Sequence, residues 1–321
     1  MLPNVSKAPT RPHAASAVRG LGPIDSRLRR FIAPSGRGAY YHPARRSMEW
    51  TLQRLYRGNW PAKLWQLWPR ATQVQCVRRS FQLLAPSAAP LRIGFVSDTH
   101  VGPTTPPALL EAAFGCLAQE RLDVLLLGGD YVYLEATPAK LATLTALIAS
   151  VPAAHKFAVL GNHDLWTHHA RIEAALRAGG ARVLVNQGLM LNPRHGPLGL
   201  IGIDDPYTGE PDVSAALAEV DDPRHLIVLC HAPDGLPQTL AALSGDTRRG
   251  LYVCGHTHGG QIASPWGPLI VPGPVGRVYP HGFHDVGPLQ LHVSRGVGAT
   301  ELPIRAFAPP EVAVIDLLPE R

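Results

Sequence analysis

The sequence predicts an α/β fold in which a sandwich of two mixed β-sheets is flanked by helices, and three observations predict it. The 321 residues, 45% hydrophobic and 17% charged, are enough for one large domain with a sizeable core. Beyond residue 90, short apolar runs alternate with helical patterns, as in sheets built mainly on parallel strands. The later runs lack long intervening helices, which indicates a second, mixed sheet.

The first 90 residues differ from the rest in charge. They hold 15 Lys and Arg against 2 Asp and Glu, a net charge of +13, whereas residues 91–321 hold 15 against 22, a net charge of −7. Residues 1–47 are rich in Pro, Gly, Ala, Ser and Arg and lack hydrophobic periodicity, so we expect a disordered extension there. Met48 opens the first patterned segment and is a candidate start of translation.

Residues 48–89 form a segment rich in Trp and Arg. Four of the six tryptophans fall within residues 50–68, and apolar side chains recur at helical spacing at Met48, Leu52, Leu55 and Tyr56. This composition suits the headgroup region of an anionic membrane. Two alternatives stay open: the helix packs on the following domain with its arginines in solvent, or the basic segment binds nucleic acid.

Residues 90–321 carry the patterns of one domain. Buried strands are expected where short apolar runs end in Gly, Asp, Asn or His, at residues 91–96, 124–127, 157–160, 226–230 and 251–254. Helices with Pro in their first turn are expected at residues 107–117 and 138–150. The second sheet is expected to include residues 198–203, 289–293 and 312–317.

Cysteine count and apolar run length exclude several classes of protein. The four cysteines have no C-x-x-C spacing, which argues against a disulfide scaffold, a zinc ribbon or a thioredoxin-like site. No apolar stretch reaches the roughly 18 to 20 residues of a membrane-spanning helix. The arginine pairs at 29–30 and 78–79 lack the apolar run of an export signal. We therefore expect a cytoplasmic protein, peripheral at most on the inner face of the membrane.

Polar blocks stand at the carboxyl ends of five expected strands. They are Asp98 with His100, Asp130, Asn162 with His163 and Asp164, His231, and His256 with His258. Each residue alone is also typical of a turn, a cap or a core position. Because open α/β sheets collect functional groups beyond the carboxyl ends of their strands, we expect the five blocks to converge. Imidazoles with two carboxylates and an amide oxygen suit Mn, Fe, Zn or Co better than Ca or Mg.

The five blocks, in this order, resemble the calcineurin-like metallophosphoesterase superfamily, whose motifs read D-x-H, G-D, G-N-H-D/E, H and G-H-x-H. The resemblance covers about residues 90–321 and implies the calcineurin-like α/β sandwich. It implies two divalent ions, with Mn²⁺ as the first expectation and Fe, Zn or Co as alternatives. One ion would be held by Asp98, His100, Asp130 and His258, and the other by Asp130, Asn162, His231 and His256.

The same resemblance implies a catalytic role for the residues beside Asn162. A hydroxide bridging the ions would attack a phosphodiester or pyrophosphate. His163 would face the phosphate as a proton donor or charge stabiliser, and Asp164 would orient the ring of His163.

Four further stretches indicate one branch of this superfamily: residues 255–261, 267–268, 294–298 and 302–305. They are similar to bacterial membrane-associated phosphodiesterases related to the transmembrane protein with metallophosphoesterase domain. Some members of that branch hydrolyse UDP-2,3-diacylglucosamine in lipid A biosynthesis, so the resemblance implies a phosphorylated small molecule or nucleotide-lipid as substrate. Arg295 and Arg305 would either contact phosphate or brace the last sheet.

Two other functions compete with this one. A nuclease or cyclic-nucleotide phosphodiesterase would use the same ligands, but the net charge of −7 on residues 91–321 argues against binding a long polyanion. A metal-binding scaffold without activity would be expected to lose ligands or the catalytic histidine, and His163 and all seven expected ligands are present.

Overall fold

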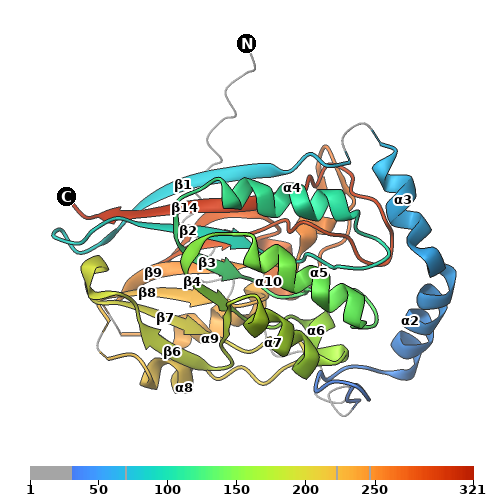
Figure 1. Ribbon diagram of the computed structural model, residues 1–321. Coiled ribbons are helices and arrows are strands. Elements are labelled where there is room, and N and C mark those ends of the chain that lie inside the picture. The colour runs from blue at the N-terminus through green and yellow to red at the C-terminus, as the bar shows by residue number, and fades with distance from the viewer. Residues whose placement is uncertain (1–30, 69–70, 222, 246) are drawn as a thin grey trace.

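The computed structural model describes residues 31–68, 71–221, 223–245 and 247–321. Two six-stranded sheets pack face to face, and helices cover their outer faces (Figure 1). Both sheets contain parallel and antiparallel pairs, so the predicted α/β sandwich of two mixed sheets is confirmed.

The first sheet has the strand order β1-β14-β2-β3-β4-β5. Its neighbours are parallel except for β14 and β2, which are antiparallel. The strands are β1 (Gln75–Leu84), β2 (Leu91–Val96), β3 (Leu122–Leu127), β4 (Ala153–Ala158), β5 (Arg182–Val183) and β14 (Glu311–Pro319).

The second sheet has the order β12-β13-β9-β8-β7-β6, with antiparallel pairs at both edges and parallel pairs between them. The strands are β6 (Gln187–Met190), β7 (Leu198–Gly202), β8 (His225–Leu229), β9 (Arg249–Cys254), β12 (Gly282–Val286) and β13 (Leu289–Val293). A small hairpin, β10 (Ala263–Ser264) with β11 (Gly267–Pro268), lies outside both sheets.

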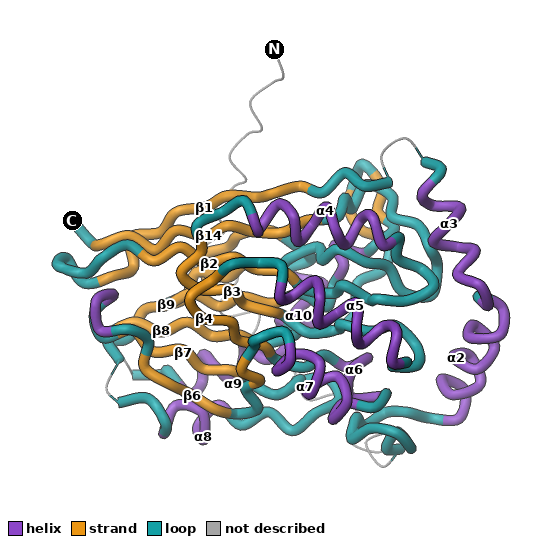
Figure 2. The backbone as a smooth tube through the Cα atoms, viewed as in Figure 1, coloured by secondary structure: helices purple, strands orange, loops and turns teal. Residues whose placement is uncertain are grey.

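Helices flank the strands on both sides (Figure 2). The first sheet packs on α4 (Pro107–Ala118), α5 (Pro138–Ala149) and α7 (His169–Ala178), and the second on α8 (Val213–Ala218) and α9 (Leu236–Ala242). The remaining helices of the domain are short: α6 (Asn162–Trp166), α10 (Pro274–Val278), η3 (Pro193–His195), η4 (Pro233–Gly235) and η5 (His258–Gly260).

Side-chain alternation along the strands separates the core into layers. In β3, Leu125 and Leu127 pack against the helices, whereas Val124 and Leu126 pack against the second sheet. Successive side chains of a strand point to opposite faces, so a strand covered on both sides is apolar at nearly every position. The expected strands 91–96 and 289–293 have the predicted bounds, and the other predicted strands differ at one or both ends. Residues 312–317 were expected in the second sheet, which was wrong, because they belong to β14 and pair with β1 and β2 in the first sheet.

The sheet begins earlier in the chain than predicted. Strand β1 forms the edge of the first sheet and pairs with β14, so the segment predicted to run over residues 48–89 ends inside the domain. Arg78 and Arg79 of β1 are exposed. Charged residues are common on edge strands and obscure the apolar pattern that identifies interior strands.

The N-terminal arm, residues 31–68, lies along the side of the domain that holds the carboxyl ends of β2, β3 and β4 (Figure 1). Its helices are α2 (Pro43–Leu55), η2 (Arg57–Asn59) and α3 (Trp60–Gln66). The prediction of a disordered extension up to residue 47 was wrong for residues 31–47. These residues contact the domain, and Arg37 forms a two-pronged ion pair with Asp204 at 2.6 and 2.7 Å. A single ion pair of this kind produces no hydrophobic periodicity in the sequence. Residues 1–30 of the predicted extension lie outside the described residues.

Helix α2 packs on the domain through a different side from the predicted one. Its less exposed residues are Arg45, Glu49 and Leu52, followed by the buried Tyr56, whereas Met48 and Leu55 are 37% and 56% exposed. The side facing the domain is therefore partly ionic. None of the helices in the described part of the chain is long and apolar enough to cross a membrane.

Candidate metal centre

Seven side chains from both sheets meet beyond the carboxyl ends of the strands. Each residue is exposed by 7% or less. The loops after β2, β3 and β4 and those after β8 and β9 contribute Asp98, His100, Asp130, Asn162, His231, His256 and His258. The structure thus brings together all the residues that the sequence nominated as ligands.

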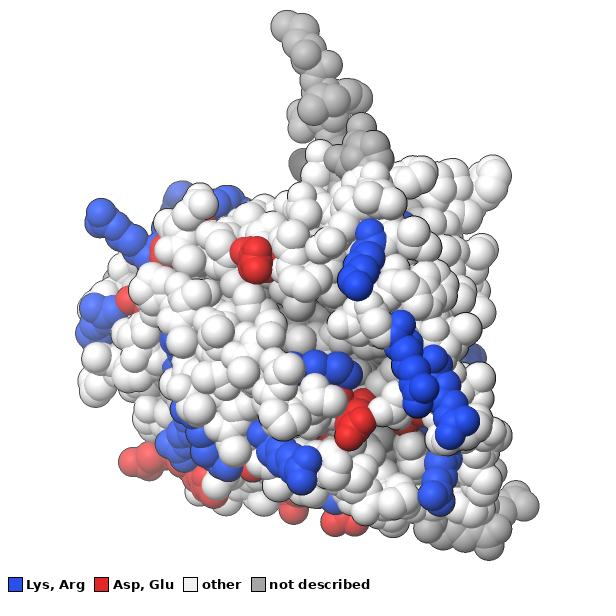
Figure 3. Space-filling model, turned by 45° about the vertical axis from the view of Figure 1, so that its right-hand side comes forward, with Lys and Arg blue, Asp and Glu red and all other residues white. Residues whose placement is uncertain are grey.

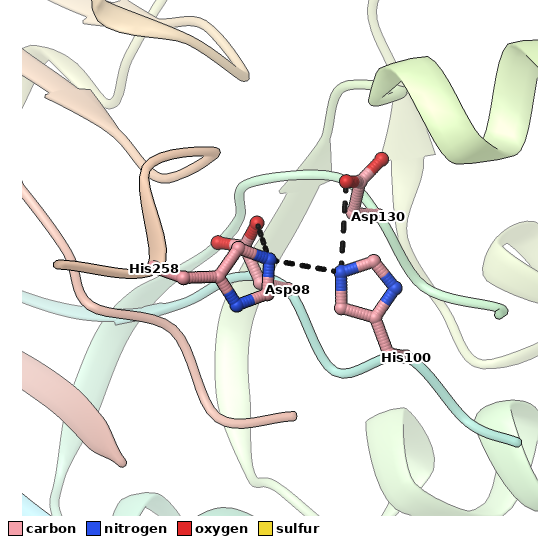
Figure 4. A group of neighbouring side chains, drawn as sticks. All are labelled: Asp98, His100, Asp130 and His258. Atoms are coloured by element: carbon pink, nitrogen blue, oxygen red, sulfur yellow. Dashed lines mark hydrogen bonds and ion pairs between the residues drawn. The ribbon is translucent and has the colours of Figure 1, made fainter. Parts of the chain in front are cut away.

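The first group joins Asp98, His100, Asp130 and His258, whose ligand atoms all lie within 4.8 Å of one another (Figure 4). The Nε2 atoms of His100 and His258 are 3.1 Å apart. A carboxylate oxygen of Asp98 lies 3.5 Å from the His258 Nε2, and one of Asp130 lies 3.6 Å from the His100 Nε2. Two carboxylates and two imidazoles therefore face one point.

The second group shares Asp130 with the first and adds His231 and His256. The His231 Nε2 lies 3.3 Å from Asp130 Oδ2, 3.2 Å from His256 Nδ1 and 3.2 Å from Asn162 Oδ1. The His231 Nδ1 lies 2.8 Å from the carbonyl oxygen of Gly128, which only accepts hydrogen bonds. Nδ1 therefore carries a proton, and Nε2 is the atom that faces the site and would be free to bind a cation there.

The spacing of these atoms fits a pair of cations. Metal bonds of ~2.1 Å at angles between square and tetrahedral place neighbouring ligand atoms ~3.0 to 3.4 Å apart. Burial lowers the pKa of His100 to about 4 and that of His256 to about 3, so both rings are neutral. Burial also disfavours the imidazolium of His231, yet the carboxylates of Asp130 and Asp98 outweigh it and raise that pKa. The carboxylates thus favour positive charge at this place.

The backbone of the ligand loops is strained. Five of the seven candidate ligands have a positive φ: Asp98 at 53°, His100 at 42°, Asp130 at 56°, His256 at 70° and His258 at 53°. Such conformations cost on the order of 1 to 3 kcal/mol per residue and cluster at functional sites. The strain supports a functional interpretation of this cluster.

Two glycines allow the loops to approach the carboxylates closely. A Cβ at Gly161 would lie 2.2 Å from Asp130 Oδ1, and one at Gly255 would lie 2.1 Å from Asp98 Oδ2. Any side chain at either position would displace a candidate ligand. These contacts explain why glycine stands beside the ligand blocks.

Asp164 supports the loops rather than the ring of His163, which corrects the predicted role. Its carboxylate accepts hydrogen bonds from the backbone N–H groups of Asp130 at 2.7 Å, Tyr131 at 2.9 Å and Gly161 at 3.0 Å. The side chain therefore joins the loop after β3 to the loop after β4. These hydrogen bonds position Asp130, the candidate ligand that the two groups share.

His163 lies beside the cluster. Its backbone N–H donates to Asp130 Oδ1 at 2.9 Å, and its ring stands edge-on to those of His100 and Trp166, with centroids 5.0 and 5.4 Å apart. Burial lowers the pKa of His163 well below its usual value against the opposing attraction of Asp130. A neutral ring in this place can donate one hydrogen bond to a group bound at the cluster.

The cluster forms one wall of a cavity of about 440 Å³. Asp130, Asn162, His163, His256 and His258 line the polar wall. The lining also includes an apolar set, which we call the apolar rim: Ile262, Leu269, Ile270, Pro272 and Leu302. One ligand could therefore contact both the polar residues beside the candidate metal ligands and the apolar rim.

Arg45 of the N-terminal arm also lines this cavity, and sequence reasoning did not single it out. Its Nη2 lies 3.5 Å from the His163 Nδ1, and its guanidinium stacks 3.9 Å from the centroid of the Trp166 ring. The adjacent arginines at 45 and 46 showed only that the segment is basic. The spatial position of Arg45 leaves no signal in the sequence.

Arg295 and Arg305, for which two roles stayed open, brace the structure. Arg295 pairs with Glu311 at 2.5 Å, and Arg305 donates to the carbonyl oxygen of His258 at 2.9 Å and to that of Ala308 at 2.8 Å. Burial lowers the pKa of Arg305 to about 10. These contacts hold the loop that carries His258.

Comparison with known proteins gives concordant findings. A family model described as calcineurin-like phosphoesterase matches residues 91–260. The chain is 31% identical over 225 residues to the uncharacterized metallophosphoesterase YkuE of Bacillus subtilis (strain 168), which covers 69% of this chain and 77% of the relative. It is 30% identical over 251 residues to the phosphodiesterase YaeI of Escherichia coli (strain K12), which covers 76% of this chain and 88% of the relative.

Among solved structures, a 5'-nucleotidase precursor from Thermus thermophilus matches with a TM-score of 0.41 and 16% identity, over 72% of this chain. This chain covers 54% of that protein, about half its length. A match at this level says nothing about activity.

Proposed function

Since the chain belongs to the calcineurin-like phosphoesterase family and is a metal-dependent phosphohydrolase, we propose that it hydrolyses a phosphodiester or pyrophosphate bond at the paired groups around Asp130. The observation that carries the proposal is that two sets of ligand atoms share Asp130 in the wall of a cavity. Two bound divalent ions would lower the pKa of a shared water and neutralise phosphate charge.

The metals proposed are two divalent ions, with Mn²⁺ preferred and Fe, Zn or Co as alternatives. Imidazole nitrogens dominate the donor set at His100, His231, His256 and His258, and carboxylate and amide oxygens complete it. Such a mixed set suits first-row transition metals better than Ca²⁺ or Mg²⁺.

His163 is proposed to act on the phosphate. Its ring lies against that of His100 and beside the Arg45 guanidinium, within the cavity wall. From there it would donate a hydrogen bond to a phosphate oxygen or to the leaving group. Asp164 would support this step indirectly, because it positions Asp130 and Gly161 by accepting their backbone N–H groups.

The substrate class is proposed to be a phosphorylated small molecule with an apolar part, such as the nucleotide-lipid UDP-2,3-diacylglucosamine. The support is the apolar rim, where Leu269 is 67% and Ile270 80% exposed, next to Trp266 at 93%. Exposed apolar groups beside a polar wall suit a ligand with a phosphate and acyl chains. The phosphodiesterase YaeI, a relative, supports the phosphodiester part of the proposal.

Peripheral contact with an anionic membrane is proposed to bring such a substrate to the cavity. Exposed residues of the arm, Trp60, Leu64, Leu67 and Trp68, would enter the headgroup region. In Figure 3 much of the face belongs to residues other than Lys, Arg, Asp and Glu, and several Lys or Arg side chains lie on its right-hand side, with others on its left edge and lower centre. Such a face suits a surface that is apolar beneath and anionic at the headgroups.

The central test is hydrolysis of bis-p-nitrophenyl phosphate by the full-length protein with and without added Mn²⁺. Asp130→Asn should lower the rate more than about 1,000-fold, because metal ions contribute several kcal/mol of charge stabilisation and both groups lose their shared ligand. Elemental analysis should show fewer than two ions per chain in the variant. A fully metal-loaded wild-type protein that turns over no phosphodiester or pyrophosphate would contradict the proposal.

The substrate class is tested separately. UDP-2,3-diacylglucosamine should be hydrolysed faster than simple phosphodiesters, and liposomes with anionic lipid should increase the rate. Degradation of DNA or RNA at physiological salt without hydrolysis of the nucleotide-lipid would instead support the nuclease alternative.

A further inference from the structure

We call the seven candidate ligands the metal cluster. The cavity beside them is lined by very few positively charged side chains. Of the described residues that line it, Arg45 is the only Lys or Arg. It comes from the N-terminal arm, whereas the candidate ligands come from the sheets. A phosphate that reaches the cluster would therefore meet one guanidinium, and that group belongs to a separate segment.

Arg45 is held in a defined orientation. Its Nε donates to Glu49 Oε1 at 2.9 Å, one helical turn along α2, and Glu49 is itself positioned by the Tyr41 hydroxyl at 2.8 Å. The face of the guanidinium rests on the Trp166 ring at 3.9 Å. A planar, preorganised guanidinium is the side chain best suited to bind phosphate oxygens in pairs.

The position of Arg45 on α2 is electrostatically unfavourable for the helix. It is the third residue of a helix that begins at Pro43 and has no acidic residue in its first turn. Cations are disfavoured near a helix N-terminus, because the exposed N–H groups there carry partial positive charge. The helix dipole therefore does not explain the arginine at this position.

Glu301 also lines the cavity and lies close to Arg45. Its Oε1 lies 3.6 Å from Arg45 Nη2, and its side chain is 38% exposed. A phosphate approaching Arg45 would replace this loose, partly exposed carboxylate as the partner of Nη2. Glu301 thus competes with an anionic ligand, whereas the Glu49 pair on the Nε side can remain.

We propose that Arg45 binds the phosphate group of the substrate beside the metal cluster, which makes the N-terminal arm a part of the active site. This proposal rests on the proposed function, since it assumes a phosphate ester as ligand. Arg45 Nη2 and His163 Nδ1 are 3.5 Å apart, so both would donate to oxygens of one phosphate when the ring carries its proton on Nδ1. Glu301 would lower the affinity for the phosphate.

The test uses metal-loaded, full-length protein and inorganic phosphate as the probe, by isothermal titration calorimetry, together with KM and kcat for bis-p-nitrophenyl phosphate. Arg45→Ala should weaken phosphate binding and raise KM about 10- to 100-fold, the loss expected for one hydrogen-bonded charge. Metal content should not change. Arg46→Ala is the matched control, because Arg46 is the next residue and is exposed.

Two further variants separate phosphate binding from a structural role. Glu301→Gln should tighten phosphate binding several-fold, the opposite sign to Arg45→Ala. Arg45→Lys should retain the charge and lose less affinity than Arg45→Ala. Added guanidinium should restore part of the phosphate affinity of Arg45→Ala but not alter that of Arg46→Ala.

The proposal is overturned if Arg45→Ala binds phosphate as tightly as wild type, or if Arg45→Ala and Arg46→Ala lose affinity equally. Parallel loss of phosphate affinity and melting temperature in both the Ala and Lys variants would make Arg45 a structural residue and would also overturn it. A wild-type protein that binds phosphate through Arg45 but hydrolyses no ester would refute the proposed function alone.

Discussion

The metal cluster and the N-terminal arm meet at one cavity but are built in opposite ways. Each candidate ligand follows the last residue of a strand by two to four positions and is itself buried. The arm instead contacts the domain through scattered polar contacts, such as the Arg37 pair with Asp204 and the hydrogen bond from the Tyr56 hydroxyl to the Glu301 carbonyl at 2.5 Å. Many of its apolar side chains are exposed.

This difference separates two tasks. Groups that must hold cations within a few tenths of an ångström sit on the ends of strands that two layers of packing hold rigid. Groups that only surround the substrate can come from an arm that a few contacts attach to the domain. Changes in the cluster should therefore abolish the chemistry, whereas changes in the arm should alter binding and leave the cluster intact.

The largest effect is expected from Gly255→Ala, which tests the cluster. The new Cβ would lie 2.1 Å from Asp98 Oδ2 and 2.3 Å from Ser97 Oγ, so the carboxylate must move. We expect loss of at least one metal ion per chain by elemental analysis and a fall in phosphodiesterase rate of more than about 1,000-fold.

Gly115→Ala is the matched control, because a Cβ at Gly115, within α4, would meet no atom within 4 Å. It should retain both ions and gain about 0.5 to 1 kcal/mol in free energy of unfolding. Equal metal binding in the two variants would show that close approach of the backbone does not matter to the cluster.

A smaller effect is expected from His163→Ala. His163 lies where the metal cluster and the N-terminal arm meet. A positioned acid-base or hydrogen-bonding group contributes at least ~100-fold, so kcat should fall about 100- to 1,000-fold. Metal content should stay at the wild-type value, since the ring is not among the grouped ligands. His155→Ala, at an exposed position, is the control and should change neither quantity. Loss of metal in His163→Ala would make His163 a ligand and contradict its assigned role.

The smallest effect on the chemistry is expected from Arg37→Ala, which tests the arm. The variant leaves the Asp204 carboxylate, whose side chain is 2% exposed, without its charged partner. The Arg37 side chain is 32% exposed, so the loss should be about 1 to 3 kcal/mol of unfolding free energy, less than for a fully buried pair. Urea unfolding measures this loss, and kcat should change less than about twofold.

The control for that variant is Arg177→Ala, which breaks the exposed pair of Arg177 with Glu173 on α7 and should cost less than about 1 kcal/mol. Limited proteolysis should cut the arm of Arg37→Ala faster than that of wild type. An unchanged cleavage rate, with unchanged stability, would show that the Arg37 pair does not anchor the arm.

The parts of the molecule that could be predicted from the sequence are those with local signals. Strand β2 and the candidate ligands Asp98 and His100 lie within one short stretch, where an apolar run ends in a polar block. The motif resemblance then grouped the candidate ligands around Asp130, and the structure places them in two sets that share this residue. The role of Asp164 was predicted wrongly, because its hydrogen bonds to Asp130 and Tyr131 cross more than 30 residues of chain.

The arm shows why the rest could not be predicted. Residues 1–47 are rich in Pro, Gly, Ala, Ser and Arg and lack periodicity, so composition favoured disorder. Gly36 and Gly38 of this segment nevertheless pack directly on the backbone of Leu165. Likewise the apolar residues of α2 did not mark its contact side, because Arg45 and Glu49 are among the least exposed residues of the helix, whereas Met48 and Leu55 are exposed.

The amino-acid sequence by itself determined the layered α/β architecture and the seven side chains that could cage two cations. Both depend on short-range patterns, since each strand and the loop that follows it are contiguous in the chain. Only the tertiary structure decided which surface covers those cations, because Arg45, His163 and Glu301 approach one another from segments up to 256 positions apart (residues 45 and 301). Contacts over such separations depend on how the sheets and the arm pack, and no local pattern encodes that packing.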